Sequence, residues 1–282
     1  MVGHVGIIAS GSCFPALARL PRLAFTERKP FAMAAMGDDP IREWILSEGK
    51  ATRITRISPV GGGCINSASQ YDTDAGSFFV KTNRRIGPSM FEGEALGLGA
   101  MYETGTIHVP RPFKVGPLPT GGSFIIMEFI EFGTSRGNQP VLGKKLAEMH
   151  KAGKSAKGFG FDVDNTIGST PQINTWTSDW VQFYGEHRLG YQLKLALEQY
   201  GDRSVYDKDG HNEAEFGMSW CAGFSGAFYD AYFKVMPKQP GYEKRRDIYL
   251  LYHYLNHYNL FGSGYRSSAM SIIDDYLRML NA

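Results

Sequence analysis

Cysteine is scarce in this 282-residue chain, which carries three: Cys13, Cys64 and Cys221. Three scattered cysteines are too few for a disulfide framework and lack metal-site spacing, so a reducing compartment is expected. Long apolar runs are also missing, since none approaches the roughly 20 residues needed to span a bilayer. A formal net charge of +2 excludes the broad basic field that binding to nucleic acid or a membrane surface requires. The expected partner is therefore a small molecule or a modified protein side chain.

Acidic residues are nearly absent from the first 36 positions. The only one is Glu27, against four basic residues: Arg19, Arg22, Arg28 and Lys29. Basic, acid-poor N-termini are typical of organellar transit peptides, which favours a chloroplast (plastid) location ahead of a mitochondrial one. The alternatives are a disordered tail or a start at Met33 or Met36, which leaves a cytoplasmic location open.

The remaining chain is predicted to change from strands to helices. A helix should begin at Pro40, capped by Asp39, and stop at Gly49. Five strands are then expected, over residues 52–60, 67–72, 78–82, 113–115 and 123–130, with one helix at 90–102. Further helices are expected over 141–151, within 176–200, and over 247–261 and 267–280. Consecutive strands followed by consecutive helices predict an α+β fold, with a strand-rich domain over 37–132 and a helical domain over 133–282.

The sharpest motif is a glycine-rich turn between two predicted strands. It consists of Gly61, Gly62, Gly63, Cys64, Ile65 and Asn66. Glycines let backbone amides come close to a ligand, as binding of phosphate oxygens requires. No Gly-Lys-Ser/Thr follows, so the motif is not a Walker P-loop. Strand–turn–strand is instead the protein-kinase arrangement over the ATP phosphates, although a glycine-rich turn taken alone is more often an ordinary tight turn.

Two residues that follow later in the chain, a lysine and a glutamate, strengthen the hypothesis of a nucleotide site. Lys81 ends an apolar strand one hairpin later, where a kinase needs a lysine for the α- and β-phosphates. Glu94 follows on a predicted helix and could orient that lysine, with Glu92 as the rival. The alternative interpretation is that Lys81 lies at a solvated strand end and that Glu94 is an ordinary acid on the helix surface. Turn, lysine and acid in the kinase order favour the nucleotide site.

An apolar strand then runs into a polar link. The residues at its end are Met127, Glu128, Phe129 and Ile130. In kinases the backbone of this edge binds adenine, whereas the alternative interpretation is a simple buried strand.

Taken together, these motifs and several others resemble the fructosamine-3-kinase / protein-ribulosamine 3-kinase (ketosamine-3-kinase) family, in its plant form. They are residues 61–66, 79–81, 91–95, 127–128, 146–150, 158–161, 165–168, 210–215 and 250–257, with Trp176, Trp180 and Phe183. The resemblance covers nearly everything from 40 to 280. It implies a two-lobe, protein-kinase-like fold and ATP- and Mg²⁺-dependent phosphorylation of the 3-hydroxyl of ketosamines. The substrates would be glycated protein lysines or small ketosamines, as in protein deglycation, and a homodimer is left open.

One part of the family pattern is absent. Relatives carry a His-Gly-Asp…Asn loop and then Asp-Pro-Ala between the helix after Trp176 and segment 210–215. The resemblance assigns the first aspartate as base for the substrate hydroxyl, and the asparagine and second aspartate as metal ligands. This chain has no His-Gly-Asp. No catalytic base and no metal ligand can therefore be assigned, and the helical lobe is expected to be incomplete near 208–210.

Local acids are poor substitutes for the missing base. Asp202, Asp207 and Asp209 lie at the junction, but none has an asparagine five residues later, and a solvated loop is the favoured interpretation. Phosphoryl transfer depends on positioning and on neutralising charge, so losing these groups should remove nearly all of the rate. The alternative function is thus an inactive, pseudokinase-like product of a truncated transcript or gene model that binds nucleotide in a regulatory role.

Two further features have a chemical and a structural interpretation. Cys64 lies among backbone N–H groups that would favour the thiolate, which makes it a candidate redox-sensitive thiol; the alternative is an unreactive small residue. His253 and His257 are spaced for one helix face, but no acidic or cysteine partner accompanies them. Their aromatic surroundings favour packing over metal binding.

Overall fold

The computed structural model describes residues 39–61, 65–131, 138–200 and 223–280. The described chain forms two compact units. The first, here called the sheet unit, comprises residues 39–91 and 112–130. The second, here called the helical unit, comprises 92–111 and the described residues from 131 onward. The helix at 92–103 thus groups with the helical unit, and the expected domain boundary near 132 stays a prediction.

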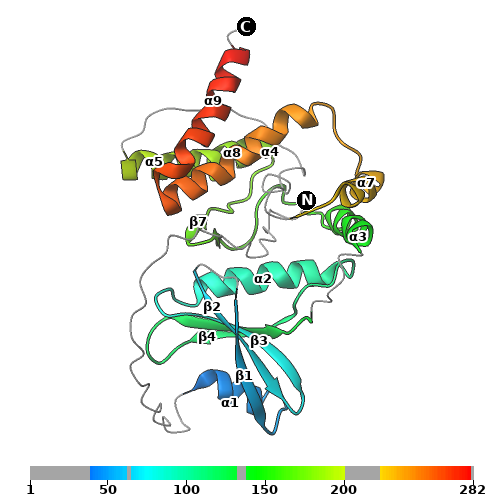
Figure 1. The fold of residues 1–282 in the computed structure, drawn as a ribbon, viewed down its shortest axis with the longest axis vertical. Coiled ribbons are helices and arrows are strands. Elements are labelled where there is room, and N and C mark those ends of the chain that lie inside the picture. The colour runs from blue at the N-terminus through cyan, green and yellow to red at the C-terminus, as the bar shows by residue number, and fades with distance from the viewer. Residues whose placement is uncertain (1–38, 62–64, 132–137, 201–222, 281–282) are drawn as a thin grey trace, which may run out of the picture. The chain divides into compact units, whose positions relative to one another are not determined.

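The sheet unit is a five-stranded antiparallel sheet with one helix (Figure 1). The strands follow in the spatial order β1-β2-β3-β5-β4. They are β1 (Ile54–Val60), β2 (Ser67–Thr73), β3 (Gly76–Asn83), β4 (Pro112–Pro117) and β5 (Ser123–Glu128). Helix α1 (Pro40–Leu46) packs Ile45 against Val80 and Ile126, which point to one face of the sheet. All five predicted strands are confirmed, with ends shifted by a few residues.

The two ends of α1 differ in how well the sequence predicted them. Asp39 Oδ1 accepts hydrogen bonds from the N–H groups of Ile41 and Arg42, both at 3.1 Å, as expected of an N-cap before proline. The expected stop at Gly49 is wrong, because the helix already ends at Leu46. Ser47 N–H and Oγ both donate to the carbonyl of Glu43, which satisfies a terminal helix carbonyl before the glycine is reached.

The helical unit begins with α2 (Ser89–Glu103), whose first residues belong to the sheet unit. Its other elements are α3 (Gln139–Ala152), β6 (Asn165–Ile167), β7 (Thr170–Gln172), α4 (Trp180–Tyr184), a π-helical segment (Gly185–Gly190), α5 (Tyr191–Tyr200), α7 (Gly226–Val235), α8 (Tyr242–Phe261), a 3₁₀ turn η3 (Ser263–Tyr265) and α9 (Arg266–Leu280). Five expected helices are found here, α2 included, while the β6–β7 hairpin and α7 were not predicted. Sheet followed by helices confirms the α+β class.

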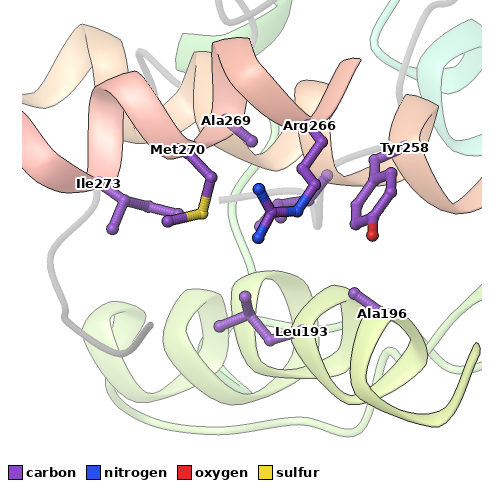
Figure 2. A pocket seen from close by; sticks show the side chains of 8 residues that line it. Leu193, Ala196, Tyr258, Arg266, Ala269, Met270 and Ile273 are labelled. Carbon is purple, nitrogen blue, oxygen red and sulfur yellow. The ribbon is translucent and has the colours of Figure 1, made fainter. Parts of the chain in front are cut away.

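Two apolar clusters hold the helical unit together. In the first, Met101 of α2 packs with Leu146 of α3 and Phe228 of α7. In the second, Tyr184 and Leu189 pack against α8 and α9. A cavity of about 20 Å³ remains between α5, α8 and α9, with Leu193 and Ala196 facing the side chains of α9 (Figure 2). That volume suits about one water molecule, so this gap is a packing defect and not a ligand site.

Among the helices of the described chain, none is both long and apolar enough to cross a membrane.

Candidate nucleotide site

A single row of residues crosses all five strands beside the glycine-rich turn. Val60 pairs with Ala68, Ala68 with Lys81, Lys81 with Ile125, and Ile125 with Val115. Residues directly opposite in an antiparallel sheet point to the same face. The strand register therefore places Lys81 in the row that borders the turn between β1 and β2. Lys81 and the described ends of the turn therefore lie at the same end of neighbouring strands, and the role of this arrangement in nucleotide binding stays a prediction.

The glycine-rich turn is described at its two ends. Gly62, Gly63 and Cys64 lie outside the described residues, so the predictions made for them stay predictions. Gly61 is exposed, and a Cβ added there would meet nothing within 4 Å. Ile65 and Asn66 at the other end are half-buried. The backbone at Gly61 is therefore open to a ligand, whereas the exit of the turn is held by the protein.

Asn83, two residues after Lys81, holds that exit. Its Nδ2 donates to Asn66 Oδ1 at 2.8 Å and to the Ile65 carbonyl at 3.4 Å. Its Oδ1 accepts from the N–H groups of Arg85 and Ile86 at 2.8 and 2.9 Å. Sequence reasoning did not identify Asn83, although the pattern Lys-Thr-Asn ahead of two arginines offered a signal for a turn-forming asparagine.

The Lys81 side chain lies on the face of the sheet opposite α1. Val80, its neighbour, belongs to the core under α1, and successive strand residues alternate in direction. Lys81 Nζ lies 5.8 Å from the centre of the Phe91 ring, and its strand partner Ile125 is fully buried. The aromatic ring and the neighbouring apolar side chains hold the ammonium of Lys81 in place.

The candidate orienting acid lies on α2. Glu94 is half-buried, whereas its rival Glu92 is exposed, which favours Glu94 for a role inside a site. Gly93 between them packs tightly: a Cβ added there would lie 2.9 Å from the Asp164 carbonyl oxygen and 3.1 Å from Asn165 Cβ. The pairing of Lys81 with Glu94 stays a prediction.

The predicted adenine edge is the end of β5. Met127 is buried opposite Phe79, and Glu128 closes the ladder opposite Phe78. Phe129 and Ile130, half-buried, follow beyond the last paired residue. The backbone that follows the ladder is the part that could bind a base edge, as the sequence analysis expected of this segment.

A polar network in the helical unit was not predicted. Arg188, on the π-helical segment, is 1% exposed and donates to the Ile173 carbonyl at 2.7 Å and to Asn174 Oδ1 at 2.6 Å. Asn174 in turn donates to Asn165 Oδ1 from Nδ2 and to Asp164 Oδ1 from its backbone N–H. Burial lowers the pKa of Arg188, although the guanidinium stays charged. The turn that contacts Gly93 is thus held by a buried cation.

The structure describes few groups that could serve as base or metal ligands. Asp202, Asp207 and Asp209 lie outside the described residues. Among the residues that are described, no group of three or more His, Cys, Asp or Glu side chains could hold a metal ion. His253 packs against Tyr252 and His257 against Tyr265, with ring centres 5.1 and 5.0 Å apart. The described donor set therefore does not fit the Mg²⁺ that the resemblance implies.

The sheet with its glycine turn and strand lysine, followed by a helical unit, defines a phosphotransferase of the protein-kinase-like fold. The family model described as fructosamine kinase matches residues 36–209 and 206–279. A chloroplastic protein-ribulosamine 3-kinase of Arabidopsis thaliana is 66% identical, with 96% of this chain and 98% of the relative covered. The chain belongs to the fructosamine kinase family.

Other relatives agree with this assignment. A protein of the same name from Oryza sativa subsp. indica is 66% identical over 89% of this chain and 87% of its own length. A ketosamine-3-kinase of Mus musculus is 34% identical over 76% of this chain and 92% of its own length. A solved structure described as a fructosamine-3-kinase, from Thermobifida fusca, has a TM-score of 0.67 at 23% identity and covers 85% of this chain and 99% of that chain. At this identity, the similarity to the Thermobifida structure supports the fold of this chain and not its function.

The comparisons also bear on the missing segment. The alignment to the Arabidopsis relative runs over 318 residues, which is longer than the whole 282-residue chain. Several dozen positions of that relative therefore have no counterpart here. The two pieces of the family match meet at residues 206–209. This is the place where the His-Gly-Asp segment was expected and not found.

Proposed function

We propose that this chain is an ATP-dependent kinase that phosphorylates the 3-hydroxyl of ketosamines on glycated protein lysines or on small molecules, a step in protein deglycation. The observation that carries the proposal is the cross-strand row that sets Lys81 beside the glycine-rich turn. The names of the relatives, ribulosamine 3-kinase and ketosamine-3-kinase, supply the substrate class.

Each part of the site has a proposed role. Backbone N–H groups of residues 61–66 receive phosphate oxygens, and Lys81 neutralises the α- and β-phosphates. Glu94 orients Lys81, and the backbone of 127–130 receives adenine. ATP is the phosphoryl donor, and Mg²⁺ would neutralise the phosphate charge when bound. No described residue is assigned to hold the metal.

A second function is supported by the same gap in the chain. Without His-Gly-Asp, no described group is placed to take the proton of the substrate hydroxyl. A protein that keeps the turn and Lys81 but lacks the base would bind nucleotide without transferring phosphate.

The proposed location is the plastid. The Arabidopsis and Oryza relatives are named chloroplastic, and the acid-poor first 36 residues fit a transit peptide. Cys64 remains a candidate redox thiol in that setting: an oxidant should reversibly lower ATP binding, and Cys64→Ala should abolish the response. Equal sensitivity in the variant would exclude the role.

The test is phosphorylation of ribulosyl-lysine by the full chain with ATP and Mg²⁺. Turnover that is lost in Lys81→Met supports the kinase. No turnover, together with ATP binding that depends on Lys81, supports the second function. In that case, grafting a relative's His-Gly-Asp segment between 208 and 210 should restore activity, and a chain that binds no ATP at all would contradict both functions.

A further inference from the structure

Asn83 uses its whole hydrogen-bonding capacity within the sheet unit. A carboxamide has two N–H donors and one oxygen with two lone pairs. Both donors go to the exit of the glycine-rich turn, at Asn66 Oδ1 and the Ile65 carbonyl. Both lone pairs go to the N–H groups of Arg85 and Ile86. Asn83 is 7% exposed, so water has little access to these bonds.

The turn after β3, which Asn83 bonds through its oxygen, is also held by a residue of β5. Ser123, fully buried at the start of β5, pairs with Asn83 in the strand register. Its Oγ donates to the carbonyls of Ile86 and Gly87 at 2.7 and 3.1 Å. Gly122 lies so close that a Cβ there would stand 2.0 Å from the Asn83 carbonyl oxygen. The turn after β3 is therefore held by hydrogen bonds with both Asn83 and Ser123, and Asn83 connects this fixed turn to Asn66.

We propose that Asn83 is a positioning residue for nucleotide binding: its carboxamide fixes the Ile65–Asn66 exit of the glycine-rich turn against the strand that carries Lys81. This inference rests on the proposed function. Asn83 touches no phosphate in this scheme. It fixes Ile65 and Asn66, the described exit of the turn, relative to the strand that carries the lysine two residues earlier. Preorganised donors cost no reordering when the ligand arrives, so loss of the link should weaken binding of the phosphates specifically.

Asn83→Ser is the sharpest variant. A serine hydroxyl can still bond the N–H groups of the following turn, because Ser and Asn both form such local turns. It is too short to reach Asn66, and it adds no charge near the triphosphate. Calorimetry should show the Kd for ATP raised about tenfold, the loss expected for one buried hydrogen-bonded link, with the Kd for adenosine unchanged. Amide exchange at Ile65 and Asn66 should become faster in the absence of nucleotide.

Asp74→Ala is the matched control. Asp74 accepts hydrogen bonds from Thr52 Oγ1 and from the N–H groups of Thr52 and Arg53, at the opposite end of β2 and β3. This variant should lower thermal stability and leave both nucleotide affinities and the exchange at Asn66 unchanged. Equal ATP affinity and equal exchange in Asn83→Ser and the unaltered chain would overturn the positioning role alone. An unaltered chain that binds no ATP would instead overturn the proposed function, and with it this inference.

Discussion

Gly93 on α2 offers a sharp test of how the helix that carries Glu94 is held. Replacing glycine by alanine inside a helix normally stabilises it by about 0.5–1 kcal/mol. At Gly93 the added Cβ would lie 2.9 Å from the Asp164 carbonyl oxygen and 3.1 Å from Asn165 Cβ. Such contacts are too short, so either the helix or the facing turn must move.

The facing turn is poorly able to move. Asn174 bonds both Asp164 and Asn165, and buried Arg188 bonds Asn174 at 2.6 Å. Overpacking a rigid site costs about 1–3 kcal/mol, which exceeds the gain in helix propensity. Gly93→Ala should therefore lower the free energy of unfolding by about 1 kcal/mol, net of that gain.

Gly99 on the same helix supplies the control, because a Cβ there meets nothing within 4 Å. Gly99→Ala should raise stability by about 0.5–1 kcal/mol. Urea titration of both variants at constant slope measures the difference, and opposite shifts of the midpoint are expected. If Gly93→Ala is as stable as Gly99→Ala, the close approach of α2 to the Asp164–Asn165 turn is refuted.

Three further changes follow from the same contacts. Arg188→Lys removes the guanidinium that bonds two acceptors at once and should lower the stability of the helical unit by about 2 kcal/mol. A melting curve measures this loss, and an unchanged melting temperature would contradict the network. Arg188→Lys should also soften the turn, so a double-mutant cycle with Gly93→Ala should give a penalty smaller than the sum, whereas additivity would show no coupling. His150 is buried against the Tyr232 hydroxyl at 2.7 Å, and burial lowers its pKa to about 4. Between pH 6.5 and 4 the unfolded state therefore binds more protons than the folded state, so lowering the pH across that window should lower the free energy of unfolding by up to about 3 kcal/mol. His150→Gln should remove that part of the pH dependence, as denaturant titrations at several pH values would show.

The sheet unit could be predicted well because its signals are local. The glycine-rich turn, the apolar run before Lys81 and the apolar run of β5 each mark an element within a few residues. The pairing of β5 between β3 and β4 is not local, because it depends on which strands share a buried face. The role of Asn83 depends on contacts with Ile65 and Asn66, 18 and 17 residues earlier, so a site built from Lys81 alone missed it.

In the helical unit, tertiary contacts override short sequence patterns. β6 and β7 have three residues each, too few for a periodic signal, and the hairpin is held by side chains such as Gln172, which donates to Tyr252 at 2.6 Å. Arg188 reads as a surface residue in sequence, because arginine is rarely buried. α7 could have been found, since Ser225 caps a run with aromatic residues at helical spacing, Phe228 and Tyr232.

The residues assigned to nucleotide binding and the gap in the family pattern fall in different parts of the chain. The residues proposed to contact the nucleotide, in 61–66, Lys81 and 127–130, belong to the sheet unit, which has its own core. Glu94, proposed only to orient Lys81, belongs to the helical unit, and the two family matches meet at 206–209. Grafting a relative's segment at the gap should therefore raise kcat by orders of magnitude and change the Kd for ATP by less than about tenfold. The reason is that the base acts on the substrate hydroxyl, while Lys81 and the turn act on the phosphates. A graft that created ATP binding where the unaltered chain has none would place the main nucleotide determinants in the helical unit, against the assignment made from the strand register.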